Sequence, residues 1–150
     1  MKTQVILELL VLSSFVGGCI NRDVTLHELA LVGEVGVAAG LPAAGQLQIE
    51  LHHAESGAGM FVHPLGLIAD FPDAGAPGTA LDLEALVPID AGTGLVLYAW
   101  LDVDGDGVLC APGVDDEPAG LARIDGFPAH ALEFSLVLDT PCVGPEALYP

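Results

Sequence analysis

Basic side chains are scarce in this 150-residue chain, which has 3 Lys and Arg against 21 Asp and Glu and a formal net charge of −18. Proteins that bind nucleic acid, or that dock electrostatically on anionic lipid, need Lys and Arg to neutralise phosphate. We therefore expect no nucleic-acid partner. Charged residues make up 16% of the chain and hydrophobic residues 52%, a balance that argues against intrinsic disorder.

Amphipathic helix patterns are also lacking, and the 19 glycines and 11 prolines disfavour a helical bundle because both residues weaken helix interiors. Apolar and polar residues instead alternate with a period of two, the pattern of a strand with one buried face. The run 95–101 is apolar on both faces, which is typical of a central strand, and Pro64 and Gly66 make 61–71 an edge strand or a loop. Strands are predicted at 29–37, 47–52, 81–84, 95–101 and 132–139.

Turn-rich stretches at 40–45, 56–59, 73–78 and 90–94 separate these runs. Several short strands with turns between them indicate a single all-β domain, an Ig-like or transthyretin-like antiparallel β-sandwich. The tail Thr140–Pro150 has no strand pattern.

The N-terminal segment has the layout of a secretory signal: Met1-Lys2, an apolar run at 9–16, and then small residues. The run is too short to span a bilayer as a helix. Val16-Gly17-Gly18-Cys19 resembles the bacterial lipobox, which implies a lipid anchor on Cys19. Ile20 follows in place of the Asp linked to inner-membrane retention, so the resemblance implies the outer membrane of the cell envelope. An ordinary signal peptide with an unrelated cysteine is the alternative.

The predicted organisation follows from this resemblance and from the strand pattern. A lipoprotein signal peptide would occupy residues 1–18, a short tether 19–24, the β-sandwich domain 25–139 and the C-terminal tail 140–150.

An acidic loop contains the candidate metal ligands of the sequence. Asp102, Asp104 and Asp106 alternate before Gly107, a spacing that can point three carboxylates at one cation, with the Val108 carbonyl as a fourth oxygen. Such an oxygen set favours Ca²⁺ over Mg²⁺. Further ligands could come from Asp115, Asp116 and Glu117.

The same segment departs from an EF-hand, because Gly113 stands where the twelfth loop position has a bidentate Glu. The flanking residues are also typical of strand and loop, not of helices. The alternative to a metal site is a solvated acidic turn in which Asp and Gly serve turn geometry alone.

The stretch Tyr98–Gly107, followed by Glu117-Pro-Ala-Gly120, resembles secreted bacterial β-sandwich modules of the carboxypeptidase-regulatory, transthyretin-like and adhesin-repeat kind. In those modules a core strand leads into an Asp-rich calcium loop and then into a Glu-Pro-x-Gly turn. The resemblance implies an Ig-like or prealbumin-like sandwich with a structural Ca²⁺ held by Asp102, Asp104 and Asp106. It implies no enzymatic activity.

If Cys19 carries lipid, Cys110 and Cys142 remain as a pair in an oxidising compartment, where a disulfide is the default. This bond would tie the acidic loop to the C-terminal tail. A catalytic thiol is disfavoured, because no His stands in a nucleophile-like setting.

Histidines offer a second metal hypothesis. His52, His53 and His63, with Met60 and Glu55, could bind copper or zinc. Against this, adjacent His52 and His53 would face opposite sides of a strand. His27 and His130 are expected to be structural.

Common nucleophile, nucleotide and zinc signatures are absent from the sequence. The sequence therefore predicts a non-enzymatic, calcium-stabilised envelope lipoprotein with a binding or structural role, whose protein or glycan partner no motif identifies. Two alternatives stay open: a periplasmic copper- or zinc-binding lipoprotein that uses the three histidines, and a small envelope hydrolase.

Overall fold

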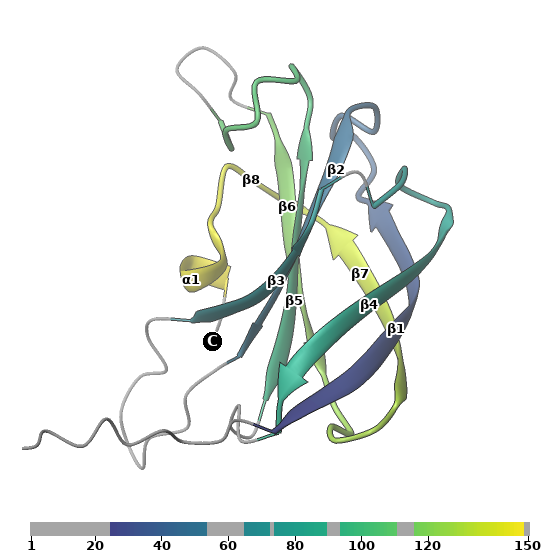
Figure 1. Cartoon of the computed structure of the whole chain (residues 1–150). Coiled ribbons are helices and arrows are strands. Elements are labelled where there is room, and N and C mark those ends of the chain that lie inside the picture. The colour runs from purple at the N-terminus through teal and green to yellow at the C-terminus, as the bar shows by residue number, and fades with distance from the viewer. Residues whose placement is uncertain (1–24, 54–64, 73, 90–93, 111–115, 149–150) are drawn as a thin grey trace, which may run out of the picture.

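The computed structural model describes residues 25–53, 65–72, 74–89, 94–110 and 116–148 (Figure 1). The predicted signal peptide, tether and Cys19 lie outside these residues. The strands are β1 Leu26–Val37, β2 Gln46–His53, β3 Gly66–Phe71, β4 Ala80–Pro88, β5 Leu95–Asp102, β6 Pro118–Ile124, β7 Ala131–Leu138 and β8 Thr140–Pro141. One short helix, α1, spans Pro145–Leu148.

Two sheets form the fold, one with the strand order β4-β1-β7 and the other with the order β3-β2-β5-β6-β8. They lie against each other as two layers (Figure 1). This arrangement confirms the all-β sandwich. All neighbouring strands are antiparallel except β1 and β7, which pair in parallel. The parallel pair departs from a purely antiparallel sandwich, and it is possible because β1 and β7 are far apart in sequence and need no tight turn between them.

The predicted alternation places one face of each strand in a single core between the sheets. Leu29 and Leu31 of β1 meet Leu47 and Leu97 of the other sheet in this core, and each is essentially inaccessible to solvent. Every residue of β5 is buried, as the run 95–101 predicted, and β5 lies between β2 and β6. The segment Gly66–Phe71 is an edge strand, one of the two predicted alternatives, whereas residues 61–64 lie outside the described residues.

Two local predictions were wrong. The stretch Glu117–Gly120 was expected to be a turn, but β6 begins at Pro118 and pairs with β5. At Gly120 an added Cβ would lie 2.2 Å from the Val137 carbonyl oxygen, so the two sheets approach too closely there for a larger residue. The tail also has structure: β8 pairs with Pro118 and Ala119 of β6, and α1 follows. Within the described chain, no helix has the length and hydrophobicity that a bilayer crossing requires.

Candidate metal centre

The acidic loop begins at the last residue of β5, at the upper end of the sandwich in Figure 1. Asp102 is paired with Gln46 of β2 and has only 3% of its surface exposed. Its position is therefore fixed by the central strand of the core. Asp104 and Asp106, in contrast, are exposed.

Backbone N–H groups organise the loop around the three carboxylates. The Asp102 carboxylate accepts hydrogen bonds from Gly105 (2.7 Å) and Gly107 (3.0 Å). Both glycines have left-handed φ angles, 78° and 75°, which side chains other than glycine rarely adopt. Asp104 accepts the N–H of Asp106 at 3.1 Å, and Asp106 in turn accepts the N–H of Val108 at 2.8 Å.

This curvature brings one carboxylate oxygen from each of Asp102, Asp104 and Asp106 within 4.8 Å of the others. Oxygens that bind Ca²⁺ lie about 2.3–2.6 Å from the ion, so two ligands on opposite sides are about 5 Å apart. The three oxygens are therefore close enough to share one metal ion. An all-carboxylate set is also the kind that hard cations such as Ca²⁺ and Mg²⁺ prefer.

The charges in the loop act on one another. Desolvation raises the pKa of the Asp104 carboxyl above its ordinary value, and the negative charges of Asp106, Glu117 and Asp102 raise it further. The hydrogen bond from the Asp106 N–H acts in the opposite direction. Without a cation, the loop therefore holds its carboxylates against their mutual repulsion.

Glu117 has a role that the sequence analysis did not assign. Its side chain is fully buried, at 0% exposure, and its carboxylate accepts N–H groups from Val103 (2.9 Å) and Cys110. It thus holds both ends of the loop from inside. Among the described residues, the carboxylates grouped closely enough to share an ion are those of the three aspartates, not that of Glu117.

Of the other predicted carboxylates, those of Asp116 and Glu117 are not grouped with the three aspartates among the described residues. Asp116 is exposed, and Asp115 lies outside the described residues. The N–H of Val108 donates to Asp106, and its carbonyl stays a predicted ligand. The structure thus brings together the front half of the predicted ligand set.

The predicted disulfide is present: Cys110 is bonded to Cys142, with their Cα atoms 5.4 Å apart. The Cys142 N–H also donates to the Glu117 carbonyl at 3.0 Å, and the Tyr98 hydroxyl donates to the Val143 carbonyl at 2.9 Å. The tail is therefore held on the outer face of the five-stranded sheet, where α1 lies on the side away from β1 and β4 (Figure 1).

The histidines do not form a comparable group. His52 lies opposite Val96 and its Nε2 is 2.8 Å from Glu50, whereas His53 lies opposite Leu95, whose side chain belongs to the inner core. The two rings therefore belong to opposite faces of β2, as expected for neighbours in a strand. His63, Met60 and Glu55, the other members of the copper or zinc hypothesis, lie outside the described residues.

His27 and His130 pack on each other. Their rings are stacked with centroids 4.6 Å apart, and His27 meets the Phe127 ring edge-on at 5.5 Å. These contacts fit the structural role expected of the two histidines.

No protein-family model, curated protein or solved structure matches this chain. The resemblance to calcium-binding sandwich modules, like the lipobox resemblance, stays a prediction from sequence.

Proposed function

We propose that this protein is a non-enzymatic lipoprotein of the bacterial cell envelope, anchored to the outer membrane through lipid on Cys19. Its Ig-like or transthyretin-like sandwich is stabilised by a structural Ca²⁺ and serves a binding or structural role. The observation that carries the proposal is the convergence of Asp102, Asp104 and Asp106 at the end of the buried strand β5.

Calcium acts on the loop by neutralising carboxylates that the fold already holds together. Because Asp102 belongs to the central strand, ion binding is coupled to the core. An ion that binds only the folded state adds RT ln(1 + [Ca²⁺]/Kd) to the free energy of unfolding. Extracellular calcium modules commonly have Kd values of about 10⁻⁴–10⁻³ M, so about 10 mM Ca²⁺ would contribute about 1.4–2.7 kcal/mol.

Thermal unfolding in EDTA and in about 10 mM Ca²⁺ tests this proposal, since that concentration exceeds the expected Kd. The wild type should melt several degrees higher in Ca²⁺. A variant with Asp104→Asn and Asp106→Asn should fold but lose this shift. The matched control, Asp70→Asn with Asp125→Asn, removes two equally exposed charges outside the loop and should keep it. If the wild type melts identically in both solutions, the loop is an acidic turn and the calcium proposal fails.

The anchor has a separate test in a bacterial host. Cys19→Ser should release the protein from the membrane fraction or leave it as an unprocessed precursor. Equal fractionation and equal gel migration of the wild type and Cys19→Ser would contradict the lipid anchor, and would leave the calcium site unaffected.

A further inference from the structure

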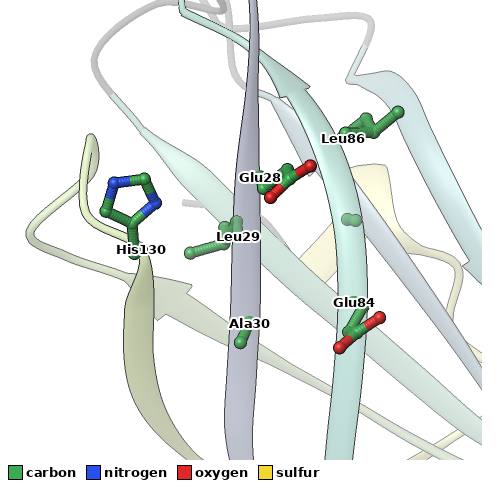
Figure 2. Close-up of a pocket in the computed structure, with 7 residues that line it drawn as sticks. Glu28, Leu29, Ala30, Glu84, Leu86 and His130 are labelled. Carbon is green, nitrogen blue, oxygen red and sulfur yellow. The ribbon is translucent and has the colours of Figure 1, made fainter.

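The outer face of the three-stranded sheet has a hollow of about 510 Å³. Its polar lining comes from Glu28 of β1, Glu84 of β4 and His130, which precedes β7. Figure 2 shows Glu28 and Glu84 on the two neighbouring strands, and His130 on the other side of β1. Leu29, Ala30, Ala85 and Leu86 supply apolar lining.

The charges of this face are all negative. Register places Glu84 opposite Ala30 and Glu28 opposite Leu86, so the two carboxylates are diagonal neighbours across β1 and β4. β1, β4 and β7 contain no Lys or Arg. Among the described residues, no ion pair involves Glu28 or Glu84.

Apolar side chains are exposed on the same face. Leu26 is 51% exposed and Leu86 56%, and strand register places them on adjacent strands, two residue pairs apart and on the same face. Val32 and Val137 are also exposed on this side of the sheet. Contiguous apolar patches on the surface of a folded domain, when they are large, mark sites of interaction.

The outer face of the five-stranded sheet differs. There, Tyr98 and Trp100 form a buried cluster with Leu148 of α1, and the tail is fastened by the disulfide. In the described part of the chain, the tail therefore covers one outer face of the sandwich, and the face with the hollow is left open.

We infer that this open face, centred on Glu28, Glu84 and Leu86, docks a basic, extended segment of another protein in which cationic and apolar residues take turns at every second position, so that both kinds face the sheet. An Arg guanidinium between Glu28 and Glu84 would form charge-assisted hydrogen bonds with both carboxylates. Apolar residues of the segment would cover Leu86 and Leu26. The inference goes beyond the proposed function and depends on neither calcium nor the lipid anchor.

Fluorescence anisotropy with a labelled peptide of sequence Arg-Ser-Leu-Ser-Arg-Ser-Leu-Ser, whose Arg and Leu side chains share one face when it is extended, tests the inference at about 150 mM salt, because this ionic strength screens distant charges. Glu28→Gln with Glu84→Gln should weaken binding about tenfold or more. Asp70→Asn with Asp125→Asn removes the same charge from exposed positions elsewhere and should weaken it less than about twofold. Equal losses in the two variants would show a response to net charge alone and would overturn the inference.

The apolar contact is tested separately by Leu86→Ser, which leaves the charge unchanged. This variant should also weaken the peptide complex, while its melting temperature should stay close to that of the wild type because the residue is exposed. Unchanged peptide affinity in Leu86→Ser would overturn an amphipathic partner. Spermidine is the remaining probe: if it displaces the peptide at equal concentration, the face binds small amines and the inferred protein segment is wrong.

Discussion

The Glu117 carboxylate accepts a hydrogen bond of 2.9 Å from the N–H of Val103, fourteen positions earlier in the chain. Its second oxygen accepts the N–H of Cys110, and its backbone carbonyl accepts the N–H of Cys142. One buried residue thus connects the two ends of the acidic loop with the start of β6 and with the tail. Both ends of the loop are therefore tied to the fold through Glu117.

Glu117→Gln should destabilise the metal-free protein by about 1–3 kcal/mol, because an amide NH₂ would face one of the two backbone donors and leave it without an acceptor in a buried site. Urea unfolding in EDTA measures the loss. The neighbouring, exposed Asp116→Asn makes the same change of charge and should lie within about 0.5 kcal/mol of the wild type. Similar unfolding midpoints for both variants would show that the contacts of Glu117 contribute nothing.

Replacing Cys110 and Cys142 together by Ala should lower the free energy of unfolding by about 3–4 kcal/mol, as the chain-entropy estimate gives for cysteines 32 residues apart. Guanidinium unfolding compares the variant with the oxidised wild type, and a wild type kept in reductant should behave like the variant. Two readily alkylated thiols in protein secreted to the periplasm, or equal midpoints for wild type and variant, would contradict this prediction.

Trp100 is the single tryptophan of the chain and is buried against the tail. Its fluorescence therefore shows whether the tail covers the sheet. Truncation after Cys142 removes Leu148 and the Val143 carbonyl that accepts the Tyr98 hydroxyl. We expect Trp100 emission to move to longer wavelength, since the indole becomes exposed to water, while far-ultraviolet circular dichroism keeps its β signal.

Tyr98→Phe removes the hydrogen bond to the Val143 carbonyl but keeps the tail. It should lower the free energy of unfolding by about 0.5–1.5 kcal/mol. Its emission should stay close to that of the wild type, because the apolar tail contacts remain. If truncation leaves the Trp100 emission unchanged, the tail does not cover the sheet in solution.

Strand periodicity predicted most of the fold because β1, β2, β4 and β7 bury the side chains of one face and leave most of the other face more exposed. Alternation alone was sufficient to predict the buried face of β7, which includes Leu132, Phe134 and Leu136. The same reasoning missed β6, whose start combines Pro118 with small residues. Gly120 is small because it lies against the Val137 carbonyl of the other sheet, and this contact across the sandwich leaves no periodic signal in the sequence.

The candidate site was also predicted only in part. The alternating aspartates lie close in sequence, so local loop geometry was sufficient to bring Asp102, Asp104 and Asp106 together. The role of Glu117 depends on backbone donors 14 and 7 residues away. Those donors lie beside Glu117 because β5 and β6 pair, and no rule of sequence spacing predicts that pairing.

Asp104 gives a pH-dependent prediction for the metal-free protein. Its raised pKa means that the folded chain binds the proton more tightly than the unfolded chain, whose carboxyl titrates near the ordinary value of 3.8. The stability that this proton contributes is fully present below that value and is lost as the pH rises through the folded pKa. At pH 7 in EDTA, the charged Asp104 therefore destabilises the loop.

Asp104→Asn keeps an oxygen for the Asp106 N–H and removes the charge. In EDTA at about pH 7 it should unfold at a higher urea concentration than the wild type, and the difference should vanish as the pH falls below the ordinary carboxyl pKa. In Ca²⁺ at about pH 7 the order should reverse, because the ion needs the carboxylate that the wild type supplies. Asp125→Asn removes an exposed charge outside the loop and should show no reversal. A wild type more stable than Asp104→Asn in EDTA at neutral pH would contradict the repulsion on which the proposed calcium effect depends.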